Sequence, residues 1–201
     1  MRTRKKRKKN RKTKKKYNLK SKKKTKKVYS KKDYSSNDGM LTSVWGPSLW
    51  HTLHVMSFNY PAKPTNKNKA DYKRFINCLR CTLPCGKCRK NLKKNLKELP
   101  LKDKDLKNRD TFSRWVYNLH ELVNKMLNKK SGLTYEQVRE RYEHFRSRCT
   151  DDKKKPVKVV IKEDGCVKPL YGKKSKCLIR IVPDTKRAKT LKIDKRCIKK
   201  R

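Results

Sequence analysis

The chain has 201 residues and a formal net charge of +46, because 63 lysines and arginines outnumber 17 acidic residues. That length suits one domain with tails. No segment approaches the roughly 20 apolar residues of a membrane-spanning helix, and no apolar h-region follows the N-terminal charges, so we expect a soluble protein without an export signal.

The first 32 residues carry 20 lysines or arginines and no acidic residue. So few apolar side chains cannot bury enough surface to offset the entropy of ordering the segment, and we predict a disordered basic tail over residues 1–41. Residues 2–32 are expected to attract polyanions such as nucleic acid. A solubilising or nuclear-address tail explains the same composition.

Two amphipathic helices are predicted after the tail. The first spans Thr42 to Tyr60, with Pro47 in its first turn and Pro61 as its stop. After a polar loop, the second spans about residues 70–83. Its apolar positions share one helical stripe: Tyr72, Phe75, Ile76, Leu79 and Leu83.

Pro84 ends that stripe and begins a third helix, which places Cys85 and Cys88 in its first turn. Unpaired amides and the positive end of the helix dipole stabilise a thiolate at this position, and the neighbouring Lys87 adds positive charge. The pair therefore has the setting of a redox dithiol.

Two further helices complete the pattern. Asp110 is a candidate N-cap for the longest periodic segment, which closes before Gly132, and Thr134 with Gln137 matches a capping box that opens the last helix. The prediction is an all-α, compact helical bundle over residues 42–149, with a four-helix core and a short fifth helix.

A basic C-terminal extension, residues 150–201, follows the bundle. Residues 157–161 and 178–182 have the composition of two short strands, which would make a small β-like hairpin. Cys166 and Cys177 flank the loop between them and are a candidate structural disulfide.

Four cysteines lie close together, as Cys78-x-x-Cys81, three residues, then Cys85-x-x-Cys88. Zinc ribbons separate their two pairs by roughly ten residues or more, which disfavours zinc. The spacing is nearer to an iron–sulfur run, but Cys78 and Cys81 fall inside a helical pattern. We predict no metal site, and expect Cys78 and Cys81 to be buried free thiols.

Four segments in order carry a resemblance to a known family: Gly46-x-x-x-Trp50-x-x-x-His54, Phe75-Ile76, Pro84-Cys85-x-x-Cys88, and Trp115-x4-His120-x2-Val123-Asn124-x2-Leu127-x-Lys129. Together they resemble the Erv/Alr family of FAD-linked sulfhydryl oxidases, over about residues 43 to 146. The resemblance implies a helical bundle that binds FAD, usually as a homodimer, and passes electrons from protein dithiols to oxygen.

The same resemblance implies roles for single residues. Cys85 would be the sulfur that a substrate thiolate attacks, and Cys88 would face the flavin. The FAD-binding residues would be Gly46, Trp50, His54, His120, Val123, Asn124 and Lys129. Core packing explains the apolar members of this set equally well when each is taken alone.

The chain also departs from the family pattern. Glu121 stands where the family usually has asparagine, and Leu83 stands where it often has tyrosine. Tyr117 and Thr134 occupy positions that carry a disulfide in cellular members. A carboxylate at position 121 is unfavourable beside a flavin or its phosphates unless it is protonated, paired or turned outward.

The resemblance therefore predicts an FAD-dependent thiol oxidase that forms disulfide bonds in protein substrates and passes electrons to O2, giving H2O2. The short core and the Trp45-Gly46-Pro47-Ser48 opening resemble members from large DNA viruses, which implies a location in the host cytoplasm or the virion. The alternative is a basic nucleic-acid-binding or virion structural protein that uses the helical core as a scaffold.

Overall fold

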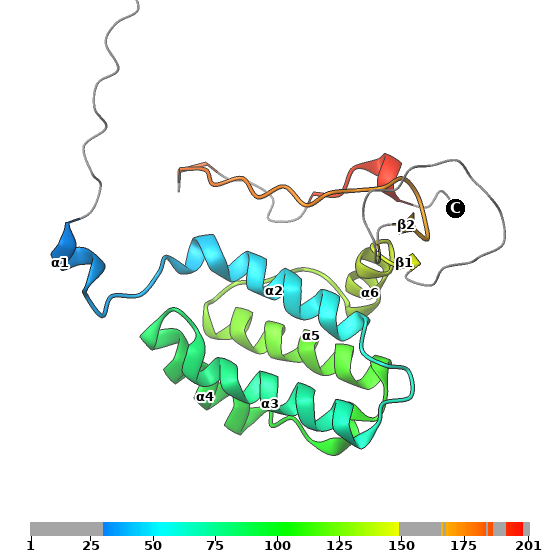
Figure 1. The fold of residues 1–201 in the computed structure, drawn as a ribbon, viewed down its shortest axis with the longest axis horizontal. Coiled ribbons are helices and arrows are strands. Elements are labelled where there is room, and N and C mark those ends of the chain that lie inside the picture. Colours follow the sequence, from blue (N-terminus) through cyan, green and yellow to red (C-terminus); the bar gives the residue numbers. More distant parts are fainter. Residues whose placement is uncertain (1–29, 149–165, 167, 184, 187–191, 199–201) are drawn as a thin grey trace, which may run out of the picture. The chain divides into compact units, whose positions relative to one another are not determined.

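The computed structural model describes residues 30–148, 166, 168–183, 185–186 and 192–198 (Figure 1). In chain order its elements are α1 (Lys31–Tyr34), α2 (Thr42–Phe58), α3 (Asn66–Thr82), α4 (Gly86–Glu98), η1 (Asp103–Leu106), α5 (Arg109–Met126), α6 (Tyr135–Glu143), β1 (Ser147–Arg148), β2 (Lys168–Pro169) and η2 (Lys195–Cys197). Internal contacts divide the chain into Met1–Asn37, which holds α1, and Asp38–Arg201, which holds all the other elements.

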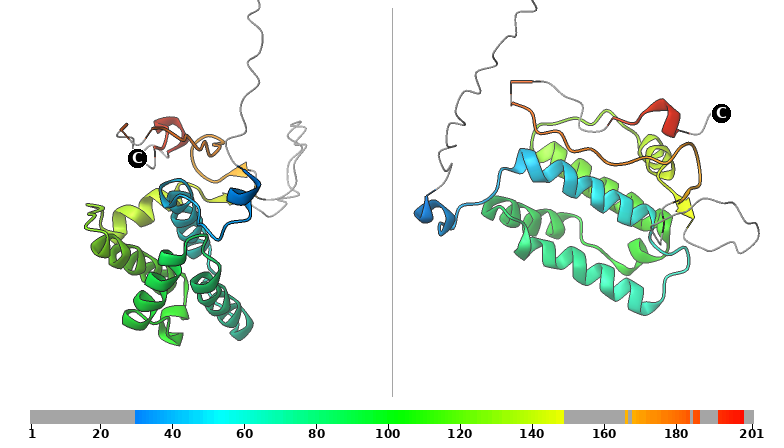
Figure 2. Two further views of the ribbon diagram at one scale, coloured as in Figure 1. Left: turned by 90° about the vertical axis from the view of Figure 1, so that its left-hand side faces the viewer. Right: turned by 45° about the horizontal axis from the view of Figure 1, so that its top comes forward.

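The predicted all-α bundle is confirmed. Helices α2 to α6 occupy the five predicted positions. α2 packs along α5, α3 packs along α4, and α4 also contacts α5, so these four helices form the core layer (Figures 1 and 2). The short α6 packs against α2.

The starts of the helices follow from local side-chain caps. The Thr134 side chain accepts a hydrogen bond from the amide of Gln137 at the start of α6, as predicted. α5, however, is capped by Asn108, whose side chain accepts from the Thr111 amide, and not by Asp110. Asp110 lies in the first turn, where its negative charge still favours the helix dipole.

The main core lies between these helices and contains Leu53, Tyr60, Ile76, Leu83, Leu92, Leu101, Leu106, Phe112, Trp115, Val116 and Leu119. Tyr60 is completely buried, and its hydroxyl donates to the Leu106 carbonyl over 3.0 Å. Its own carbonyl accepts from Arg109 Nε at 2.7 Å. These two bonds join the end of α2 to η1 and to the start of α5, which fixes how far apart the helices can lie.

A smaller cluster of Phe58, Tyr135 and Val138 attaches α6. The hydroxyls of Ser113 and Tyr135 are 2.7 Å apart in this cluster, so a buried hydrogen bond connects α5 with α6. The cluster therefore combines apolar burial with a satisfied polar pair.

The C-terminal extension differs from its prediction. β1 pairs antiparallel with β2, and the Leu170 amide donates to the Arg146 carbonyl over 2.9 Å. The predicted strand at 157–161 lies outside the described residues. Residues 178–182 form no strand, and the side chains of Leu178, Ile179 and Ile181 are 70–75% exposed. Because no apolar layer from the described residues covers them, their strand-like composition is insufficient to form a strand.

The candidate disulfide between Cys166 and Cys177 is wrong. Cys177 is a free, exposed thiol. Cys166 is in a disulfide bond that does not include Cys177. The predicted pairing depends on a hairpin whose two strands hold the sulfurs close together. Residues 178–182 form no strand, so the condition for that pairing is not met.

A single helical turn occurs where only disorder was predicted. In α1 the Ser30 hydroxyl accepts from the Asp33 amide, and Asp33 Oδ2 accepts from the Ser30 amide at 2.8 Å. This reciprocal cap is enough to stabilise one turn. Among the described residues, no helix is both long and apolar enough to cross a membrane.

Candidate active site

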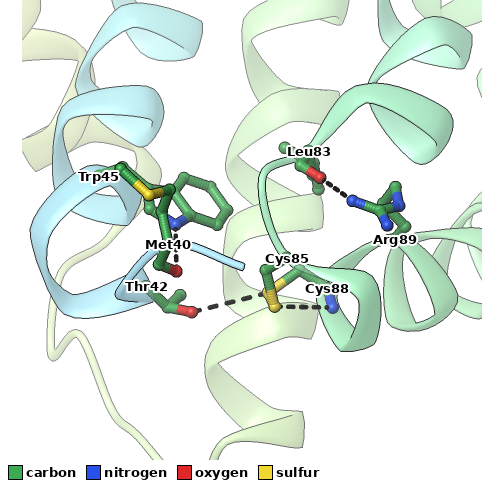
Figure 3. The surroundings of a disulfide bond; sticks show 7 residues. All are labelled: Met40, Thr42, Trp45, Leu83, Cys85, Cys88 and Arg89. Atoms are coloured by element: carbon green, nitrogen blue, oxygen red, sulfur yellow. Dashed lines mark hydrogen bonds between the residues drawn. A yellow bond between two sulfur atoms is a disulfide. The ribbon is translucent and has the colours of Figure 1, made fainter. Parts of the chain in front are cut away.

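A disulfide bond between Cys85 and Cys88 lies at the N-terminus of α4, with the two Cα atoms 5.2 Å apart (Figure 3). Cys85 is the N-cap residue, and its sulfur accepts a hydrogen bond from the Cys88 amide over 3.2 Å. The pair therefore occupies the start of the helix, where amide groups and the dipole favour negative charge on sulfur.

A tight turn fixes this position. Leu83 is the C-cap of α3 and is buried in the core, and its carbonyl accepts from the Cys85 amide at 2.8 Å and from the Arg89 side chain. Pro84 cannot continue α3 without the amide that a helix needs. The local sequence thus ends one helix and starts the next within three residues.

A short segment that we call the N-terminal strap, Gly39–Thr42, lies against this turn (Figure 3). The Met40 amide donates to the Pro84 carbonyl over 2.8 Å, and Trp45 Nε1 donates to the Met40 carbonyl over 3.0 Å. A Cβ atom on Gly39 would come 2.8 Å from the Pro84 carbonyl oxygen and 3.2 Å from Cys85 Cα. Only glycine allows the strap to approach so closely.

The strap brings Thr42 to the redox pair. Thr42 Oγ1 lies 3.7 Å from Cys88 Sγ, a hydrogen bond to sulfur, and because a disulfide sulfur carries no proton, the hydroxyl is the donor. Cys88 also packs against the main core, whereas Cys85 is outside that cluster. The two sulfurs therefore have different surroundings.

Deeper in the bundle, α2 and α5 contribute a cluster of rings. His54 Nε2 and His120 Nδ1 are hydrogen-bonded at 3.0 Å, and the Trp50 ring stacks on the His120 ring with centroids 4.0 Å apart. Burial lowers the pKa of His54 to about 3 and that of His120 to about 4. Both imidazoles are therefore neutral at pH 7, which lets one donate and the other accept.

Several buried polar atoms have no hydrogen-bond partner among the described residues: His51 Nδ1, His54 Nδ1, Asn95 Nδ2 and Trp115 Nε1. Leaving such an atom unsatisfied costs about 1–3 kcal/mol, so a group of them is unusual in a folded interior. Such atoms are candidates for hydrogen bonds to a bound molecule.

Of the other predicted cofactor-binding residues, three lie on the same two helices and Lys129 lies just after α5. Gly46 is buried in α2, and an added Cβ would meet only Thr42 Cγ2, at 3.5 Å. Val123 and Asn124 are half-buried near the end of α5, and the Lys129 amide, in the exposed segment after α5, donates to the Asn124 carbonyl. The structure thus brings Trp50, His54 and His120 into mutual contact, and Gly46, Val123 and Asn124 lie three or four residues from one of them on the same helix.

Glu121 is half-buried, and its Oε1 accepts a hydrogen bond from Asn124 Nδ2 over 3.0 Å. This hydrogen bond comes from a neutral amide, so it satisfies one carboxylate oxygen without compensating its charge. The same bond occupies one amide proton of Asn124.

The expectation that Cys78 and Cys81 are buried is wrong, because both are exposed free thiols. They follow Ile76, the buried residue of α3, by two and five positions. At roughly 100° per residue, those positions lie on the side of the helix opposite Ile76. Cys78 and Cys81 are close to the apolar stripe in sequence, but they lie on the exposed side of the helix.

Comparisons with known proteins concern the family of the chain. The model of the Erv1 / Alr family matches residues 47–143. A probable FAD-linked sulfhydryl oxidase from Acanthamoeba polyphaga mimivirus is 38% identical over 99 residues, which are 49% of this chain and 68% of that protein. An FAD-linked sulfhydryl oxidase from African swine fever virus is 36% identical over 43% of this chain and 70% of that protein.

The mitochondrial FAD-linked sulfhydryl oxidase of Saccharomyces cerevisiae is 34% identical over 84 residues, and this chain spans 43% of its length. A crystal structure of the FAD binding domain of that yeast protein gives a TM-score of 0.47 at 30% identity, over 51% of this chain and 94% of the yeast domain.

Proposed function

The chain belongs to the Erv1/Alr family and is an FAD-dependent thiol oxidase, in which we propose that Cys85 and Cys88 form the redox-active pair. The observation that carries this assignment is the Cys85–Cys88 disulfide at the N-terminus of α4, with Cys88 packed against the same core cluster as Trp50. A dithiol at that position can exchange with an external thiol and still reach a group held inside the bundle.

The interior fits a flat, polar cofactor. The Trp50, His54 and His120 rings offer stacking surfaces, and His54 Nδ1 and Trp115 Nε1 are buried polar atoms in need of partners. Lys129 carries positive charge three residues after the end of α5 and would pair with phosphates. Bound FAD supplies the two-electron acceptor for the dithiol and the donor to O2.

The protein's own residues perform thiol–disulfide exchange. A substrate thiolate attacks Cys85 Sγ, the Cys85–Cys88 bond breaks, and its electron pair leaves on Cys88 as a thiolate. A second substrate thiolate then attacks the substrate sulfur of the mixed disulfide. The substrate leaves oxidised, and Cys85 and Cys88 together keep two electrons, with protons from solvent balancing the charge. The positive end of the α4 dipole favours the thiolates as they form, and the Cys88 amide donates to Cys85 Sγ.

Protein thiols are the substrates that the family implies. With them we propose O2 as the final acceptor, H2O2 as its product, and a homodimeric assembly. The matches in mimivirus and African swine fever virus support a virus-related protein. We assign it to the host cytoplasm or the virion, where the basic segment 2–32 binds nucleic acid or another polyanion.

The assignment of the pair is tested by oxygen uptake with dithiothreitol as the reductant. Cys85→Ser and Cys88→Ser should each abolish turnover, whereas the matched control Cys78→Ser/Cys81→Ser, which changes two exposed thiols on α3, should keep it. If either single variant consumed oxygen as fast as the parent, the assignment would be wrong. A protein that carries no flavin when purified would instead favour the nucleic-acid-binding or structural alternative.

A further inference from the structure

The two sulfurs of the disulfide receive hydrogen bonds from different donors. Cys85 Sγ accepts from the Cys88 amide, and Cys88 Sγ accepts from the Thr42 hydroxyl. Because the helix amide of the pair is directed at Cys85, the Thr42 hydroxyl is the donor that the described residues offer to Cys88. We propose that Thr42 stabilises the Cys88 thiolate when the disulfide is opened, an inference that depends on the proposed redox role of the pair.

The chemistry makes this contact more valuable after the bond breaks than before. Attack on Cys85 Sγ leaves the electron pair of the broken bond on Cys88, so a neutral sulfur becomes an anion. A hydrogen bond to an ionised acceptor is roughly twice as strong as one between neutral groups. Thr42 keeps its proton throughout and favours Cys88 as the leaving group, which is stabilisation that grows along the reaction.

The strap holds the hydroxyl in place. Thr42 is the first residue of α2, and the N-cap residue is Leu41, which makes no side-chain hydrogen bond. Thr42 is therefore not the capping residue of the helix. Met40 is fixed on both sides, by Pro84 and by Trp45. Threonine is β-branched and stiff about χ1, so a fixed backbone also fixes the hydroxyl.

The test measures the pKa of the Cys88 thiol directly and does not rely on turnover. In the full-length, FAD-loaded Cys85→Ser protein, the pH dependence of alkylation at Cys88 is followed by peptide mass spectrometry. Adding Thr42→Val should raise that pKa by about one unit, a tenfold loss of thiolate at a fixed pH below it. Thr42→Ser should restore it. Thr52→Val is the matched control, because the Thr52 hydroxyl donates to the Ser48 carbonyl on the same helix.

Gly39→Ala provides an independent perturbation, since its Cβ would displace the strap from the turn and carry Thr42 away. Gly39→Ala should raise the pKa of Cys88, as Thr42→Val does. An unchanged pKa in Thr42→Val, or equal shifts in Thr42→Val and Thr42→Ser, would overturn the inference. Such a result leaves the redox assignment standing, because oxygen uptake by the Cys85 and Cys88 variants tests that separately.

A second observation concerns the charge on α4. Four of its five exposed lysines follow one stripe with spacings of three, four and three residues: Lys87, Lys90, Lys94 and Lys97; the fifth is Lys93. No ion pair involves them within the described part of the chain, although Lys73 and Arg74 on the adjacent α3 do pair with acidic residues. No acidic residue occurs anywhere from 72 to 97.

This lysine stripe begins between the two redox cysteines and extends for ten residues, or about 15 Å along the helix. An extended polypeptide covers that length with roughly five residues. We infer that the protein substrate is acidic in the few residues beside its reactive cysteine. A polypeptide is favoured over nucleic acid as the occupant, because the molecule on the stripe must present a thiol to Cys85.

The test compares two dithiol peptides of equal length, one with aspartates and one with asparagines beside the cysteines. At low salt the parent should oxidise the aspartate peptide with a kcat/KM about tenfold higher, and added salt should reduce the ratio. Lys90→Gln/Lys94→Gln should lower the ratio more than the charge-matched control Lys63→Gln/Lys104→Gln.

A ratio near one for the parent, or an equal loss in the control, would refute the acidic-substrate inference. If the ratio stayed near one while the α4 variant lost affinity for a single-stranded oligonucleotide, the stripe would be a nucleic-acid site instead. Dithiothreitol oxidation, measured in parallel, shows whether the enzyme is active at all. Failure of the oxidase function is thereby distinguishable from failure of the substrate inference.

Discussion

The buried histidine pair makes the fold sensitive to mild acid. Burial lowers the pKa of His54 to about 3 and of His120 to about 4, from an ordinary value near 6.5. Below pH 6.5 the unfolded chain therefore binds protons that the native protein does not, and stability falls with pH until the native values are reached. Between pH 6.5 and pH 5 the loss in free energy of unfolding due to His54 is about 2 kcal/mol, at 1.36 kcal/mol per pH unit. The loss due to His120, which is only half-buried, is smaller.

Urea unfolding at pH 7 and at pH 5, followed by far-ultraviolet circular dichroism at one FAD concentration, measures this loss. The parent should be about 2–4 kcal/mol less stable at pH 5. His54→Phe keeps a ring against Phe58 and Tyr142 but removes one of the two sites, so it should lose markedly less over the same interval. Equal losses for parent and variant, or a parent that is as stable at pH 5 as at pH 7, would refute the reasoning.

Three further outcomes follow from packing and exposure. Leu106→Ala removes a completely buried side chain and should lower the free energy of unfolding by about 2–5 kcal/mol, measured by urea titration at pH 7. Tyr135→Phe removes the buried hydrogen bond between Ser113 and Tyr135, leaves the Ser113 hydroxyl its bond to the Asp110 carbonyl, and should cost about 1 kcal/mol in the same titration; no change would show that the removed bond contributes nothing. Iodoacetamide should label Cys78 and Cys81 in the native protein without reductant, and protection of both would contradict their exposure.

The sequence predicted the fold well because its signals are local. Apolar periodicity located α2 to α6, and the capping box at Thr134 located the start of α6. Where two cap candidates compete, local pattern is weaker: Asn108 caps α5 although Asp110 is an equally good residue type. The prediction for the C-terminal extension failed for a different reason. Residues 178–182 have strand composition, but the described residues offer no apolar layer for them to pack on.

The motif proposes a set of site residues but gives no information about their arrangement. The motif identified Cys85, Cys88 and the two histidines, but nothing in it indicates that His54 donates to or accepts from His120. The strap is invisible to periodicity, because Gly39–Thr42 matters only through its tertiary contact with Pro84. Contacts of this kind join segments more than forty residues apart, and a single sequence carries no local signal for them.

The central claim is that electrons pass from Cys85 and Cys88 to a bound flavin. Its most direct test is the visible absorption spectrum of the purified protein during anaerobic addition of dithiothreitol. We predict flavin absorption bands that bleach in the parent and persist in Cys85→Ser and Cys88→Ser. A colourless protein would contradict the account. So would flavin bands that bleach in the two cysteine variants as they do in the parent.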